Sequence, residues 1–232
     1  MTRAVEEVVS AAEVARFSAL APRWWEPKGP MRPLHAMNGL RVGWIGGHLR
    51  RALGPGVSVV DVGCGGGLAA EALARDGYRV TGLDASAEAV GVARAHAAES
   101  GLAVEYRVGV AEDVAAEGLR FDAVTALEVI EHVPDQAAFL GTLAGLVRPE
   151  GMVFVSTLNR TVRSLAVAKV GAEYVARLLP AGTHDWRKFV KPEELAAMAR
   201  RAGLRLVAEP GLVDQLHRRV FAPLIWVIRA QE

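Results

Sequence analysis

The sequence predicts an α/β fold with a doubly wound, mostly parallel sheet of seven strands, N-terminal helices and one inserted amphipathic helix. From Gly56 onward, short apolar runs rich in β-branched residues alternate with segments of helical periodicity. A chain of 232 residues is long enough for one large domain or a domain with appendages. We expect an N-terminal helical cap over residues 1–54 and a main domain over 55–232, with the amphipathic insertion at 161–190.

The apolar runs and the periodic segments between them give the predicted elements in chain order. Strands are expected at 57–62, 78–83, 103–108, 121–127, 151–157, 204–209 and 224–229. Helices are expected at about 67–76, 86–99, 135–147, 161–179 and 192–202. Ser86 can cap the second of these helices. Pro192 is suited to begin the last helix and Gly203 to end it.

Composition restricts the partners and the compartment. A formal net charge of +1 gives no general electrostatic case for binding nucleic acid. A single cysteine excludes an intramolecular disulfide framework and favours a reducing compartment. The N-terminus lacks the basic-then-apolar pattern of a signal peptide, and no uncharged apolar run approaches the length of a membrane span. We expect a cytoplasmic protein that at most touches the inner face of a membrane.

The most informative segment is the glycine-rich turn Asp61-Val62-Gly63-Cys64-Gly65-Gly66-Gly67. It leaves a predicted strand and enters a predicted helix, where residues without a Cβ let a ligand approach the backbone closely. Asp84 ends the next apolar run, 21 residues after Gly63, where a carboxylate can accept hydrogen bonds from ribose hydroxyls. The third glycine of a dinucleotide fingerprint would fall on Leu68, so that pattern fails. An adenosine-type cofactor other than a nicotinamide dinucleotide is indicated.

Two carboxylates and an imidazole follow the predicted strand 121–127. Glu128, Glu131 and His132 would share one face of a helix. Such a set suits magnesium, manganese or zinc. A bound metal would lower the pKa of a phenol from about 10 and favour the nucleophilic phenolate. The alternative is that this segment only shapes a pocket.

Four further features have competing interpretations. The segment 161–179 has a basic polar face opposite a wide apolar face, which suits either a membrane interface or packing on the sheet. Arg41 could pair with a cofactor carboxylate or lie on the surface. His184, beside Asp185, is either a general base or a structural histidine. The pair Trp24-Trp25 is more typical of core or lid packing than of ligand contact.

Together these segments resemble the ubiquinone-biosynthesis O-methyltransferase family, which belongs to the class I S-adenosylmethionine-dependent methyltransferases. The most specific matches are Arg23-Trp24-Trp25, Ser156-Thr157-Leu158-Asn159-Arg160 and Gly182-Thr183-His184-Asp185. The glycine turn alone is shared by the whole superfamily. The resemblance implies a Rossmann-like enzyme that methylates catechol-type hydroxyls of polyprenylated benzenoid intermediates. After Gly211 the sequence departs from the family pattern, which leaves open a different small acceptor, methylated on oxygen or carbon.

The resemblance also implies roles for individual residues. The expected contacts of S-adenosylmethionine (SAM) are Arg41, Gly63, Gly65, Asp84, Glu112 and Leu127. The expected ligands of a magnesium ion are Glu128, Glu131 and His132. From the residues alone, the expected catalytic base is His184. A lipid-resident substrate strengthens the expectation that residues 161–179 contact a membrane. Association with other quinone-pathway enzymes is a further expectation, with a non-catalytic scaffold of such an assembly as the alternative.

Overall fold

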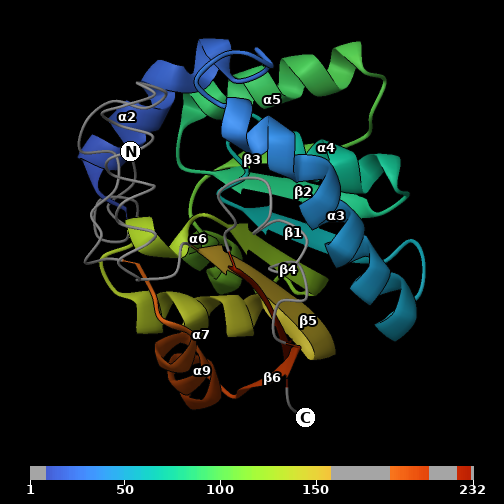
Figure 1. Ribbon diagram of the computed structural model, residues 1–232, viewed down its shortest axis with the longest axis vertical. Coiled ribbons are helices and arrows are strands. Elements are labelled where there is room, and N and C mark those ends of the chain that lie inside the picture. The colour runs from blue at the N-terminus through green and yellow to red at the C-terminus, as the bar shows by residue number, and fades with distance from the viewer. Residues whose placement is uncertain (1–8, 158–188, 209–223, 231–232) are drawn as a thin grey trace.

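The computed structural model describes residues 9–157, 189–208 and 224–230. Its strands form one sheet in the order β3-β2-β1-β4-β5-β7-β6 (Figure 1). Neighbours among β1 to β5 pair in parallel, whereas β7 is antiparallel to both β5 and β6. The predicted doubly wound, mostly parallel sheet is therefore confirmed. The strands are β1 (Ser58–Val62), β2 (Arg79–Asp84), β3 (Glu105–Val108), β4 (Phe121–Leu127), β5 (Val147–Thr157), β6 (Leu204–Ala208) and β7 (Leu224–Ala230).

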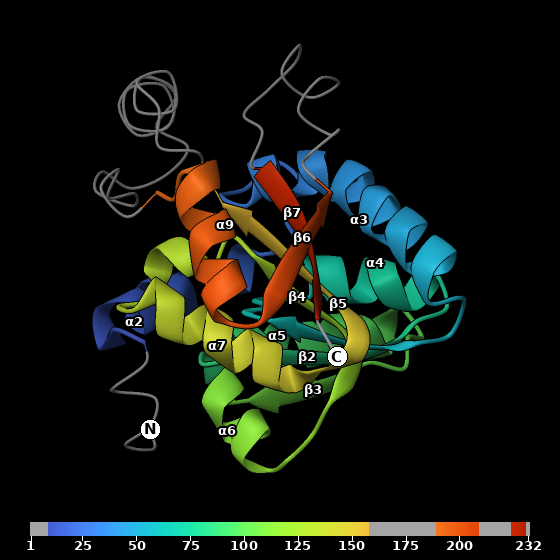
Figure 2. The same cartoon turned by 90° about the horizontal axis from the view of Figure 1, so that it is seen from below.

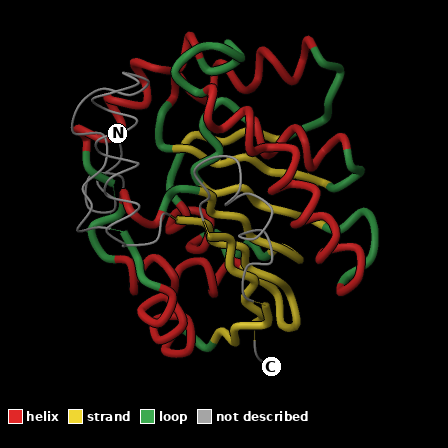
Figure 3. Tube along the Cα trace, viewed as in Figure 1, coloured by secondary structure: helices red, strands yellow, loops and turns green. Residues whose placement is uncertain are grey.

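Helices cover both faces of this sheet (Figures 2 and 3). Successive side chains of a strand point to opposite faces, so that Val59 packs with α3, α4 and α5 while Val60 packs with α6, α7 and α9. Two apolar layers result, one on each side of the sheet. The described helices are α2 (Ala11–Leu20), η1 (Ala21–Arg23), α3 (Arg32–Ala52), α4 (Leu68–Arg75), α5 (Ala87–Glu99), α6 (Ala111–Ala116), η2 (Ile130–His132), α7 (Gln136–Leu146) and α9 (Pro192–Arg201).

Helix α3 belongs to the core of the sheet. Its residues Ile45 and Leu49 are fully buried in the same apolar cluster as Val59. Residues assigned from sequence to an N-terminal cap thus include a helix that is integral to the main domain. The division at residue 54 stays a prediction, and α2 with η1 are the parts that lie over the strand ends.

The sequence missed one helix and placed the start of one strand wrongly. Helix α6 was not predicted, because six residues are too few to display a helical period. Strand β5 begins at Val147 rather than 151, where Val147 pairs with Phe121 before the register shifts. The expected helix 161–179 lies outside the described residues. No helix in the described ranges is long and apolar enough to cross a bilayer.

Candidate active site

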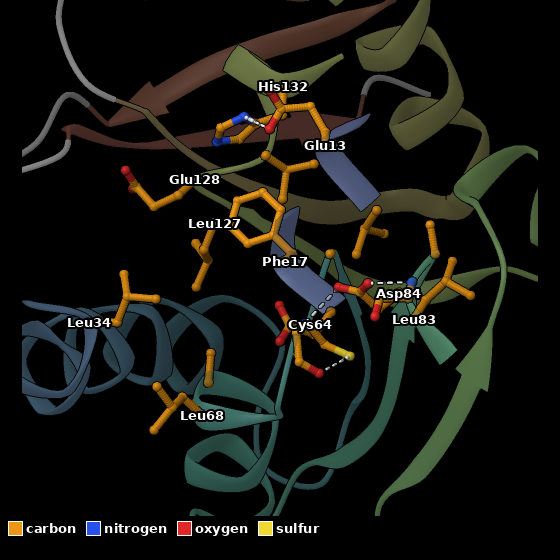
Figure 4. Close-up of a pocket in the computed structure, with 18 of the residues that line it drawn as sticks. Glu13, Phe17, Leu34, Cys64, Leu68, Leu83, Asp84, Leu127, Glu128 and His132 are labelled. Carbon is orange, nitrogen blue, oxygen red and sulfur yellow. Dashed lines mark hydrogen bonds and ion pairs between the residues drawn. The ribbon is translucent and has the colours of Figure 1, made fainter. Parts of the chain in front are cut away.

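A cavity of about 460 Å³ lies at the carboxyl ends of the central strands, beneath α2 and the start of α3 (Figure 4). Its volume is within the range of roughly 300–1,000 Å³ typical of small-molecule sites. Ligands of open parallel sheets bind at this edge. The predicted site residues that line the cavity are Arg41, Gly63, Gly65, Asp84, Glu112, Leu127, Glu128, Glu131 and His132. His184 lies outside the described residues.

The glycine turn is packed against the N-terminal segment. Gly65 has a φ of 52°, and a Cβ built there would lie 2.1 Å from the Trp24 ring. A Cβ on Gly63 would lie 2.5 Å from a methyl group of Val129. Trp25 adds a hydrogen bond of 2.8 Å from Nε1 to the carbonyl of Gly66. These glycines therefore permit close packing within the protein as well as approach by a ligand.

Asp84 lies at the end of β2, where it holds the glycine turn in place. Its Oδ2 accepts a hydrogen bond from the backbone N–H of Gly65, and its Oδ1 accepts one from Ser86, each at 2.8 Å. Burial raises the pKa of Asp84. Each carboxylate oxygen can accept more than one hydrogen bond, so the same oxygens can also accept from a pair of ribose hydroxyls. The predicted capping role of Ser86 is confirmed, since its Oγ accepts from Ala89 N.

Arg41 is buried at the wall of the cavity, with 5% of its surface exposed. Its Nε donates to Asn38 Oδ1 at 3.1 Å, and Asn38 in turn donates to the carbonyl of Leu68 at 2.7 Å. Burial lowers the pKa of Arg41, an effect that the carboxylates of Glu128 and Asp61 oppose. The alternative of a solvated surface arginine is thereby excluded.

Asp61 is anchored to the neighbouring strand. Its Oδ1 accepts a hydrogen bond of 2.6 Å from the Thr125 hydroxyl on β4. Burial raises the pKa of Asp61 to about 6. Its charge lies close enough to Arg41 to stabilise both groups.

Glu112 presents an oxygen without a hydrogen-bond partner among the described residues. Its Oε1 accepts from the Thr142 hydroxyl at 3.0 Å, whereas its Oε2 is buried and unpaired. An unpaired buried acceptor costs about 1–3 kcal/mol. A donor from a ligand, such as an exocyclic amino group, would remove that cost.

The segment from Glu128 to His132 does not form the expected helical face. Glu128 has a φ of 60°, and a 3-10 turn follows at Ile130–His132. The Ser156 hydroxyl donates to Glu128 Oε1 at 2.5 Å, while His132 Nδ1 lies 3.2 Å from Glu13 Oε2. In the part of the chain that the structure describes, no group of three His, Cys, Asp or Glu side chains could hold a metal ion. The predicted ligand set of Glu128, Glu131 and His132 is therefore not assembled.

Desolvation alters the titration of this segment. Burial, reinforced by the Glu131 carboxylate, raises the pKa of Glu128 to about 8. Burial alone would lower the pKa of His132, but the hydrogen bond with Glu13 and the nearby carboxylates raise it. Glu13 and Phe17 were not foreseen as site residues, because sequence separation gives no sign that α2 meets η2. The Phe17 ring stands edge-on to His132, with ring centres 5.3 Å apart.

Sequence comparison places this site in a family. Residues 15–209 match a family model described as a methyltransferase domain. The ubiquinone biosynthesis O-methyltransferase of Xanthomonas axonopodis pv. citri is 51% identical over 203 residues, which cover 87% of this chain and 84% of the relative. The protein of the same name from Thiobacillus denitrificans is 49% identical over 224 residues, covering 96% and 92%. The chain belongs to this family. The resemblance predicted from the sequence is thus confirmed.

A solved methyltransferase structure has the same fold as this chain. The magnesium protoporphyrin IX methyltransferase from Synechocystis PCC 6803, solved with bound SAM, superimposes with a TM-score of 0.66. The alignment covers 94% of this chain and 97% of that one at 18% identity, so the likeness concerns the fold alone. The fold is the SAM-binding, Rossmann-like fold of class I methyltransferases.

Proposed function

We propose that this enzyme transfers a methyl group from SAM to a catechol-type hydroxyl of a polyprenylated benzenoid intermediate in ubiquinone biosynthesis. Family membership supports the reaction. The observation that carries the proposal is a single cavity with two kinds of lining. Asp84, Glu112 and Arg41 supply polar groups, and α2 supplies a largely apolar wall. Such a cavity suits a polar cofactor beside an apolar acceptor.

The described residues fit SAM by their chemistry. The guanidinium of Arg41 would bind the methionine carboxylate, since its fork matches a carboxylate geometrically. Asp84 would accept hydrogen bonds from the ribose hydroxyls, and the unpaired Oε2 of Glu112 would accept one from the adenine amino group. Gly63, Gly65 and Leu127 would form the wall against which the cofactor lies. When bound, SAM supplies a methyl group on a positively charged sulfur.

The acceptor oxygen must lose its proton as the new C–O bond forms. His184 is the base proposed from the sequence. His132 is a second candidate within the described residues, because Glu13 holds its Nδ1 and thereby directs the other ring nitrogen to accept a proton. Much of the rate enhancement would come from holding the two reacting atoms in attack geometry.

The proposal is tested with a short-chain prenylated catechol and SAM carrying a deuterated methyl group. The expected product gains one labelled methyl group on a phenolic oxygen, identified by mass spectrometry and fragmentation. Transfer to carbon, or to an unrelated acceptor only, would contradict the proposed substrate. SAM binding without any transfer would favour a non-catalytic scaffold.

The proposal includes a cytoplasmic location, with residues 161–179 touching the inner membrane face and with other quinone-pathway enzymes as neighbours. The basic polar face of that segment supports the membrane contact. Co-sedimentation with anionic vesicles tests it. Binding that is equal with and without anionic lipid would count against an electrostatic membrane contact.

A further inference from the structure

The inner face of α2 is an apolar stripe over the cavity. Glu13, Val14, Phe17 and Leu20 of α2 line the cavity at helical spacing, and Val9, two residues before the helix, lines it as well. All five are half-buried, and α2 contains no fully buried residue. An amphipathic helix normally buries its apolar face against the core. Here Phe17 and Leu20 pack in part against the cluster of Trp24, Met31 and Leu68, but the face also borders the cavity. It therefore leaves apolar surface for a ligand to cover.

The one charged side chain in this stripe is already paired. Glu13 contacts His132 Nδ1 at 3.2 Å, and the Phe17 ring lies edge-on to the same imidazole. Figure 4 shows this pair beside Phe17, with Leu127 on the adjacent wall. With Glu13 directed at His132, the other α2 side chains that line the cavity are the apolar Val14, Phe17 and Leu20.

A second part of the cavity lining is apolar as well. Val133 and Phe139, in the segment that leads from η2 into α7, line the cavity and are 5% and 4% exposed. Both belong to the apolar core cluster of that face of the sheet, so this wall is rigidly supported. The polar groups suited to SAM come from other elements, namely α3, the glycine turn, β2 and α6.

We infer that the stripe on α2, together with Val133 and Phe139, binds the first isoprene units of the acceptor's hydrocarbon tail. This inference rests on the proposed function, and it assigns to α2 the selection of prenylated over unprenylated catechols. Each methylene group that leaves water contributes about 0.8 kcal/mol, so two isoprene units suffice for a strong preference. The tail, rather than the ring, would then determine affinity for the acceptor.

Val14→Trp tests the inference because it fills the space beside the stripe, and Ala15→Trp is the matched control on the exposed side of the same helix. Two catechols are compared, one bare and one carrying a geranyl chain. The expected result for Val14→Trp is a loss of about tenfold or more in kcat/KM for the geranyl catechol, mainly in KM. The bare catechol and the Ala15→Trp variant should retain wild-type values. Equal losses for both acceptors, or an undiminished preference for the geranyl chain, would overturn the inference.

A binding measurement separates this inference from the proposed reaction. The geranyl catechol with both hydroxyls already methylated cannot react, and calorimetry gives its affinity for the SAM-loaded protein. The inference requires that the wild type and Ala15→Trp bind it and that Val14→Trp binds it about tenfold more weakly. If Val14→Trp fails to fold, Val14→Ser replaces it in this test. Its smaller, polar side chain should also weaken binding of the dimethylated geranyl catechol. Absence of binding to the wild type refutes the tail site, whereas binding without methylation of the free catechol refutes the proposed function alone.

Discussion

At the scale of single residues, the structure of the glycine turn explains why a side chain is excluded at Gly65. Gly65 adopts a positive φ and lies under the ring of Trp24, while its N–H donates to Asp84. A side chain there would both strain the backbone and displace the ring. The sequence pattern signals a ligand-binding turn, but the contact with Trp24 appears only in the structure.

Gly65→Ala is expected to destabilise the protein by at least about 2 kcal/mol and to weaken SAM binding, because the new Cβ would overlap the Trp24 ring. Gly43→Ala is the control. A Cβ on Gly43, an exposed residue of α3, meets nothing within 4 Å, and alanine favours a helix by up to about 1 kcal/mol. Urea unfolding of both variants checks the prediction. Equal stabilities would show that the turn relaxes freely.

Asp84→Asn is expected to weaken SAM binding by about 10-fold to 100-fold, measured by calorimetry, because hydrogen bonds to a charged group contribute about 1.5–3 kcal/mol. An amide has one oxygen, which cannot accept from Gly65 N, Ser86 N and a ribose hydroxyl together. Asp76→Asn, at an exposed position, serves as control. Near-native affinity of Asp84→Asn would argue against the assignment of the ribose site.

At the scale of elements, α2 and η1 connect loops that follow different strands. The Ser18 hydroxyl lies 2.8 Å from both Ser86 Oγ and Glu88 Oε2, after β2. Glu13 reaches His132, after β4. Trp25 holds the glycine turn after β1 through Gly66. This N-terminal segment therefore covers the cavity, and its position is fixed by contacts with the loops after β1, β2 and β4.

Trp25→Phe is expected to lower the unfolding free energy by about 1 kcal/mol through loss of the hydrogen bond to Gly66, and to weaken SAM binding. The stacking of Trp25 on His96, with ring centres 3.4 Å apart, should largely survive in the phenyl ring. Trp44→Phe, on α3 away from the cavity lining, is the control for loss of an indole. Calorimetric titration with SAM and thermal unfolding measure the two effects. Unchanged affinity would limit Trp25 to a structural role.

At the scale of the whole molecule, the site concentrates buried acids at one edge of the sheet. Asp61, Asp84 and Glu128 all have raised pKa values, because folding removes them from water. Arg41 is the buried cation among them and compensates part of that cost. The stability of the fold should therefore depend on pH through these groups.

Asp61→Asn is expected to change this pH dependence in a defined direction. The pKa of Asp61 is about 6 in the folded state and about 3.9 when unfolded, so the folded state binds more protons between these values. Stability contributed by protonated Asp61 is present below pH 4 and is lost as the pH rises to 6. Between pH 4 and 6, the unfolding free energy of the variant should therefore rise relative to that of the wild type by up to about 3 kcal/mol. Above pH 6, the difference between the two should stay constant. Urea unfolding at pH 4 to 7.5 measures the difference, and a constant offset at every pH would contradict the assignment.

The fold and much of the site could be predicted because their signals are local. Alternating apolar runs predict a doubly wound sheet, and the glycine turn with Asp84 predicts an adenosine-type cofactor. Local sequence signals could not decide whether the predicted metal ligands come together. Glu128, Glu131 and His132 suit a metal by type and spacing, but a positive φ at Glu128 and a 3-10 turn replace the expected helix. Among the described residues, the three side chains do not form a group that could hold a metal ion.

The sequence by itself determined the fold class, the cofactor turn and the family, because each depends on residues that are neighbours along the chain or lie at a fixed period. Only the tertiary structure decided that Arg41 is buried, that Trp24 covers Gly65 and that α2 faces the cavity. Glu13 and His132 are 119 residues apart in the sequence and 3.2 Å apart in space. Such contacts arise from how the layers pack, and no local pattern of residues encodes the distance between them.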